Sequence, residues 1–252
     1  MMTVYFTSDW HLWHTNIIKY AKRPFENASD MNKTILDNFF DTVIRGSTVY
    51  FLGDFAFGSA SRHQEIRGIL KDIDDHCKFH VILGNHDHRI QGLLVEECES
   101  VAPLKEIKIG SQKITLCHYP MHSFNGSHHN NWQLYGHHHR DTNTIIPGKR
   151  YNVCLEANYY RPISFEELHA KMSQREDNWD FIPPERRRRQ QDSDHLRKEL
   201  AKEKKKLASL RGKMNEVFLE KAPEKVVSEA KMYLARQETL VEELEEKLDQ
   251  NP

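Results

Sequence analysis

The sequence has no apolar run approaching the roughly 20 residues needed to cross a bilayer, and it does not open with a charged and then apolar leader. We therefore expect neither a membrane span nor a membrane partner. Cysteine is scarce, and Cys77, Cys98, Cys117 and Cys154 form no CxxC pair. Scattered cysteines of this kind are typical of reduced thiols, so we expect a cytoplasmic protein.

Net charge is also nearly absent. The formal value of −1 gives no global field that would attract nucleic acid or a membrane. The composition changes sharply near residue 183, because all four tryptophans, all four cysteines and all but one of the 11 glycines precede it. We therefore expect a globular domain over residues 1–183 and a different element over 184–252.

Five short polar motifs stand out within the first 140 residues, each directly after a run that reads as a buried strand. They are Asp9-Trp10-His11, Gly53-Asp54, Gly84-Asn85-His86-Asp87, His118, and Gly136-His137-His138-His139. Ligands at the ends of neighbouring strands converge on one edge of a sheet. Carboxylate, amide and imidazole together suit Mn, Fe, Zn or Ni better than Ca or Mg, so the pattern predicts a metal centre.

The ordered motifs D-x-H, G-D, G-N-H-D, H and G-H-x-H resemble the calcineurin-like metallophosphoesterase superfamily over residues 1 to about 170. Any one motif is weak evidence, whereas five in order are strong evidence. The resemblance implies a four-layer α/β/β/α sandwich and a two-metal phosphoester hydrolase. One departure is Trp13, which stands where the family commonly has glycine.

Carried over by residue, the resemblance implies two metal sites that share the Asp54 carboxylate. The first would be held by Asp9, His11, Asp54 and His139, and the second by Asp54, Asn85, His118 and His137. We expect two divalent ions, with Mn first and Fe, Zn or Ni as alternatives.

The chemistry implied is attack by a metal-activated hydroxide, since two metals can clamp the attacking and leaving oxygens at phosphorus. The sequence offers no serine or cysteine in a recognisable nucleophile setting. His86 would assist the leaving group, and Asp87 would fix the orientation of His86. Among the remaining histidines, His14 and His122 are candidates for substrate contact, as is Asn125 in the polar loop 125–131; the alternative for that loop is a mobile connector.

Periodicity indicates alternating elements in the first half and strands in the second. Residues 30–45 read as an amphipathic helix, and 106–109 with 113–116 read as a hairpin around Gly110-Ser111. We also expect a strand at 142–146 and a helix at 164–173 with Ser164 and Glu167 as a capping box. Together these features favour two packed sheets with helices outside.

The tail, 184–252, reads as an antiparallel helical hairpin of coiled-coil type. Leu196, Leu200, Leu207 and Leu210 form one apolar seam, a Pro223 break follows, and Val241, Leu244 and Leu248 belong to a second seam. The first helix is basic, with 12 Lys or Arg against 4 Asp or Glu over 186–213, and the second is acidic, with 8 Asp or Glu against 4 Lys or Arg over 224–249. We expect it either to form a homo-oligomer or to lie on the first domain.

Three functions remain open from the sequence. The first is a phosphodiesterase, acting also on monoesters as an alternative, for a small nucleotide-like substrate. The second is a nuclease or nucleic-acid end-processing enzyme that holds nucleic acid with Arg186–Lys213. The third is a silent scaffold whose hairpin is the working part. The basic run is more simply a solvated face paired with the acidic helix, and the intact ligand set argues against the scaffold.

Overall fold

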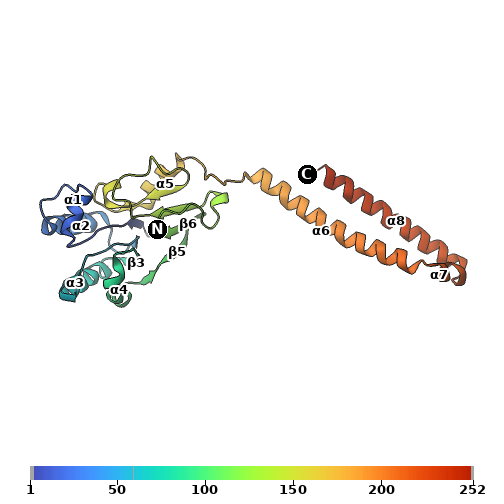
Figure 1. The fold of residues 1–252 in the computed structure, drawn as a ribbon, viewed down its shortest axis with the longest axis horizontal. Coiled ribbons are helices and arrows are strands. Elements are labelled where there is room, and N and C mark those ends of the chain that lie inside the picture. Colours follow the sequence, from blue (N-terminus) through green and yellow to red (C-terminus); the bar gives the residue numbers. More distant parts are fainter. Residues whose placement is uncertain (1–2, 59, 251–252) are drawn as a thin grey trace. The chain divides into compact units, whose positions relative to one another are not determined.

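The computed structural model describes residues 3–58 and 60–250 and divides into two compact units, Met1–Phe181 and Ile182–Pro252 (Figure 1). The first unit holds both sheets and helices α1 to α5, and the second holds three helices. The fold is mixed α/β with a C-terminal helix pair, which confirms the predicted fold class.

The first sheet has the strand order β4-β3-β2-β1-β9, parallel except for β9. Its strands are β1 (Val4–Thr7), β2 (Thr48–Phe51), β3 (Lys78–Ile82), β4 (Ser100–Ala102) and β9 (Ile163–Ser164). The helices that connect its parallel strands are α1 (Thr15–Tyr20), α2 (Ala28–Thr42), α3 (His63–Asp74) and α4 (Gln91–Glu97). Parallel neighbours place the carboxyl ends of β1, β2 and β3 at one edge, where three of the motifs begin.

The second sheet has the order β5-β6-β7-β8. Its strands are β5 (Leu104–Ile109), β6 (Gln112–Cys117), β7 (Trp132–Tyr135) and β8 (Arg150–Asn152). The predicted hairpin is present as β5–β6 and turns at Gly110, whose φ is +58°. The predicted strand at 142–146 is wrong: Thr142 accepts the amides of both Ile145 and Ile146, so the chain turns there.

Two apolar clusters hold the first unit together. One lies between helices α1 to α4 and the first sheet, with Trp10 at its centre and fully buried. The other joins the two sheets, bringing Phe6 and Leu52 together with Leu116 and Leu134. Helix α5 (Phe165–Ser173) adds Leu168 and Met172 to this second cluster, and the Ser164–Glu167 capping box that starts it was correctly predicted.

The loops of the first unit contain four short 3-10 turns: Ala60–Arg62, Asp87–Arg89, Ser127–His129 and Leu155–Ala157. Polar residues of the second sheet bond to loop backbone. Gln133 donates to the Tyr119 carbonyl at 3.0 Å, and Asn152 donates to the carbonyls of His138 and Arg140 at 2.9 and 3.0 Å. The Asn152 bonds fix the loop that carries the last motif, and the Gln133 bond fixes the chain just after His118.

The second unit consists of α6 (Pro184–Lys213), α7 (Glu216–Lys221) and α8 (Glu224–Asp249). Helices α6 and α8 pack antiparallel through a seam of leucines and one valine. The seam residues are Leu196, Leu200, Leu207, Leu234, Val241, Leu244 and Leu248. None of the helices in the described part of the chain has the length and apolar character that crossing a membrane requires.

Candidate metal centre

Four side chains from three motifs meet at the edge of the first sheet. Asp9, His11, Asp54 and His139 each offer a ligand atom, and these atoms all lie within 4.8 Å of one another. Asp9, His11 and Asp54 are essentially fully buried. These are the four residues assigned above to the first metal.

A second group shares Asp54 with the first. The Asn85 Oδ1 atom lies 3.1 Å from both His118 Nε2 and His137 Nδ1, and His118 Nε2 lies 3.4 Å from Asp54 Oδ2. The structure therefore brings together all seven residues named as metal ligands, with Asp54 between the two groups.

One unpartnered ligand atom indicates that these residues suit a metal ion. His11 Nε2 is buried and makes no hydrogen bond within the described structure, although Asp54 Oδ2 lies 3.3 Å away. A buried imidazole nitrogen without a partner is costly, and a metal ion would satisfy it. In His118 the two ring nitrogens have different partners. Its Nδ1 lies 2.7 Å from the Leu52 carbonyl, and its Nε2 lies near Asn85 and Asp54.

The carboxylates of the centre differ in pKa for physical reasons. Burial raises the pKa of Asp9 to about 6, against the opposing effect of His118 and His139. Burial also opposes ionisation of Asp54, but the neighbouring His11 and His118 side chains hold its pKa well below the usual range. Of the two carboxylates, Asp54 therefore stays ionised to the lower pH.

The ligand loops adopt backbone conformations that most residues avoid. Asp9, His11, Asp54 and His137 all have positive φ, between 50° and 68°. Trp13 shares this geometry at φ 62°, a conformation that glycine adopts at least cost, so the departure noted above stands at a strained position. Unfavourable backbone held by the surrounding structure is typical of functional sites.

Two motif glycines are required by close packing. A Cβ on Gly84 would collide with the Asp54 carboxylate, and one on Gly53 would lie 2.6 Å from both the Gly84 nitrogen and His118 Nδ1. Because these positions are glycine, the segments that follow β2 and β3 can approach closely, and Asp54 and Asn85 lie near each other.

His86 lies beside the first group, with its ring centroid 5.1 Å from that of His11. The role predicted for Asp87 is wrong: its described hydrogen bonds go to the backbone amides of Asp54, Phe55 and Gly84, and not to the His86 ring. Asp87 instead joins the second motif to the third.

The three residues predicted to contact substrate lie in different places relative to the metal ligands. His14 lies at the site, with its Nδ1 3.3 Å from His11 Nδ1 and its ring stacked on the exposed Phe57 at 4.4 Å. His122 stacks on Trp179 instead, at 4.9 Å. Asn125 donates to Glu106 on β5 at 2.9 Å. The described contacts bring neither His122 nor Asn125 to the metal ligands, and their contact with a substrate stays a prediction.

Arg23 and Glu156 were not predicted from the sequence. Their side chains form a buried ion pair, with Arg23 Nε 2.9 Å from Glu156 Oε1, and Glu156 Oε1 also lies 3.3 Å from His139 Nδ1. Neither residue belongs to a motif, and 133 positions separate them. Glu156 is the single charged residue of 151–160, whereas Arg23 lies among other charged residues and gave no signal.

A protein of Methanocaldococcus jannaschii, the uncharacterised protein MJ1445, is 34% identical to this chain over 171 residues. The match covers 66% of this chain and 89% of the archaeal protein. The chain belongs to the same family. The crystal structure of AQ665, a protein of unknown function from Aquifex aeolicus, has 25% identity and a TM-score of 0.55, and the match covers 68% of this chain and 99% of that one.

Two further matches are of different kinds. The phosphoesterase Yfce of E. coli has 16% identity and a TM-score of 0.37, and the match covers 62% of this chain and 80% of that one. Residues 190–250 match the family model described as the valyl tRNA synthetase tRNA binding arm. That match lies wholly within the second unit.

Proposed function

We propose that the first unit is a metal-dependent phosphoric ester hydrolase, with phosphodiesters as its preferred substrates. The observation that carries the proposal is the pair of ligand groups that share Asp54. Two bound divalent ions would supply a deprotonated water as nucleophile and neutralise charge on the phosphoryl oxygens. The mixed oxygen and nitrogen ligands favour Mn, with Fe, Zn or Ni as alternatives.

The residues of the chain divide the remaining work. Asp54 lies between the two groups and can hold both ions close together. His86 belongs to neither group and lies beside the first, where its ring can protonate the leaving oxygen. His14 and the exposed Phe57 flank the same edge and can contact the organic part of an ester.

The test is Mn-dependent hydrolysis of bis-p-nitrophenyl phosphate and p-nitrophenyl phosphate. We expect diester cleavage by the wild type that disappears in Asp54→Ala and falls in His86→Ala. Asp37→Ala, which removes an exposed carboxylate of α2, is the matched control and should retain full activity. If the protein holds two metals and hydrolyses neither ester, the proposed activity on small phosphoesters is contradicted.

A second candidate function is hydrolysis of a nucleic-acid phosphodiester, held by the basic helix α6. Two observations favour it. The described ion pairs between α6 and α8 are Lys204–Glu245 at 2.5 Å and Arg211–Glu238 at 2.6 Å, and they include neither Arg186 nor Arg189. The match of residues 190–250 to a tRNA-binding arm supports the same interpretation.

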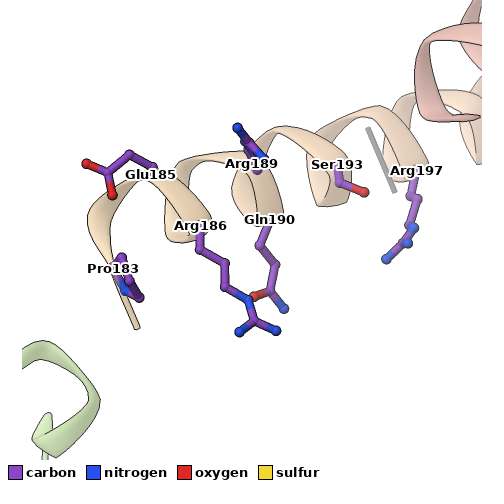
Figure 2. A pocket seen from close by; sticks show the side chains of 7 residues that line it. All are labelled: Pro183, Glu185, Arg186, Arg189, Gln190, Ser193 and Arg197. Carbon is purple, nitrogen blue, oxygen red and sulfur yellow. The ribbon is translucent and has the colours of Figure 1, made fainter. Parts of the chain in front are cut away.

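Several arginines lie close together in the first half of α6. Figure 2 shows Arg186, Arg189 and Arg197 projecting from one stretch of the helix around a pocket that Gln190 and Ser193 also line. Arg186 and Arg189 are exposed, as phosphate contacts must be.

Binding of a labelled tRNA at increasing salt tests this candidate. Replacing Arg186, Arg188 and Arg189 by Gln should weaken binding and lower the slope of log affinity against log salt by about three. Replacing Lys225, Lys231 and Arg236 of α8 by Gln removes the same charge and is the control. Equal losses in the two triple variants would indicate net charge rather than a binding surface on α6.

A further inference from the structure

We infer that the buried Arg23–Glu156 pair positions one half of the metal centre, by tying His139 to the loop that carries Asp9 and His11. This inference rests on the metal centre proposed above and assigns a role to two residues outside its ligand set.

The Arg23 side chain binds backbone carbonyls of the first ligand loop. The side chain is buried, its Nη2 donates to the Asp9 carbonyl at 2.6 Å and its Nη1 donates to the Trp10 carbonyl at 2.8 Å. Asp9 and His11, on either side of Trp10, both have positive φ. A guanidinium offers five donors in a fixed plane, so one side chain can fix two consecutive carbonyls and still bind a carboxylate.

Glu156 carries the connection to the last motif. Its Oε1 accepts from Arg23 Nε at 2.9 Å and lies 3.3 Å from His139 Nδ1. The other ring nitrogen, His139 Nε2, lies 3.8 Å from Asp9 Oδ1, inside the ligand group. A carboxylate on one imidazole nitrogen keeps the proton there and leaves the lone pair of the other nitrogen for a metal.

The pair therefore acts on one ligand group only. Through Arg23 and Glu156, ligands 130 positions apart in the chain are held in one orientation. The second group has a different support, because His118 Nδ1 bonds to the Leu52 carbonyl and Asn85 follows β3. In the described contacts neither Arg23 nor Glu156 touches His118, Asn85 or His137. Loss of the pair should consequently weaken one metal site and spare the other.

The decisive experiment is calorimetric titration of the full-length, metal-free protein with Mn²⁺, comparing the wild type with Glu156→Gln. We expect two binding steps in the wild type. In Glu156→Gln one step should weaken by about 10- to 100-fold, which is the usual effect of removing the partner of a ligating histidine, and the other should keep its affinity. Arg67→Gln, which removes the two ion pairs of Arg67 on α3 with Glu96 and Glu97 on α4, is the control.

A second variant guards against loss of folding. Arg23→Lys keeps the charge beside Glu156 but cannot reach both carbonyls and the carboxylate at once, so it should weaken the same step by a smaller factor. For both variants, the kcat/KM for a diester should recover as Mn²⁺ is raised, because the defect is in occupancy of the site.

Two results would overturn the inference. One is unchanged affinity at both steps in a folded Glu156→Gln. The other is equal weakening of both steps together with a lower melting temperature, which would indicate that the pair only stabilises the fold. A wild type that binds no Mn²⁺ would instead refute the proposed metal centre, and the inference with it.

Discussion

The Asp87 carboxylate bonds to the backbone amide of Asp54, with Asp87 Oδ2 2.9 Å from the nitrogen. The same oxygen accepts from the Gly84 amide at 2.8 Å, and Oδ1 accepts from Phe55 at 2.8 Å. Three amides on one buried carboxylate join the ends of β2 and β3. Asp54 therefore takes its position from a residue that lies outside both ligand groups and whose described hydrogen bonds do not include the His86 ring.

This relationship predicts the effect of Asp87→Asn. The asparagine amide group would direct an NH₂ toward backbone N–H groups, so at least one amide loses its acceptor. We expect the free energy of unfolding to fall by about 1–3 kcal/mol and Mn²⁺ binding to weaken at both sites, since both use Asp54. Urea unfolding and Mn²⁺ titration of the variant measure the two effects, and full affinity at both sites would contradict the argument.

His86 gives a prediction that depends on the substrate. A general acid matters most when the leaving oxygen is a poor leaving group, and little when the product is p-nitrophenolate. We expect His86→Ala to reduce kcat by about 10²–10⁴ for an alkyl diester and by much less for bis-p-nitrophenyl phosphate. Steady-state kinetics on the two esters measure the difference. Equal losses on both esters would assign His86 a role in binding rather than in proton transfer.

Glu156 makes the stability of the metal-free protein depend on pH. Burial opposes its ionisation, but the hydrogen bond from His139 and the charge of Arg23 lower the pKa of Glu156 from 4.5 to about 2. A pKa depressed by folding gives stability that is present above pH about 4.5 and is lost as the pH falls toward 2. The contribution is on the order of 3 kcal/mol.

Glu156→Gln removes that titration. Denaturant unfolding of the metal-free wild type and variant between pH 5 and 2.5 should therefore give a shallower loss of stability with acid in the variant. The variant is also less stable at pH 7, because Arg23 stays buried without its carboxylate. Parallel pH profiles would show that Glu156 does not titrate in this range.

The motifs that end strands could be predicted from the sequence because strand ends and side-chain chemistry are both local. Val4-Tyr5-Phe6 before Asp9 and Val49-Tyr50-Phe51 before Asp54 are visible as apolar runs, and parallel pairing then brings their ends together. The resemblance supplied the division into two ligand groups. The Ser164 cap was equally local, since its partner Glu167 is three residues away.

Interactions between distant segments could not be predicted in this way. Arg23 and Glu156 lie 133 positions apart, and nothing in either neighbourhood marks a partner. Asp87 was assigned to the adjacent His86, whereas two of its three partners, Asp54 and Phe55, lie at the end of another strand. His122 is near the ligand His118 in sequence, yet it stacks on Trp179. Proximity along the chain was a poor guide wherever a loop turned away from the site.

The second unit contains a polar pair where its seam should be apolar. Glu203 occupies the heptad position between Leu200 and Leu207, and its Oε2 accepts from Gln237 Nε2 on α8 at 2.6 Å. Single polar residues at seam positions fix the register of paired helices at a cost in stability. The Glu203–Gln237 bond thus favours one alignment of α6 against α8.

Replacing both Glu203 and Gln237 by Leu should therefore raise the melting temperature of the helix pair by a few degrees, since a buried polar pair exchanged for apolar packing is often stabilising. The same change should relax the alignment and allow association with other copies. Circular dichroism at 222 nm on the full chain measures the first effect, and light scattering measures the second. Glu203→Leu alone leaves Gln237 without its acceptor and should be less stable than the double variant. A double variant that melts lower than the wild type would show that the polar pair contributes stability rather than register.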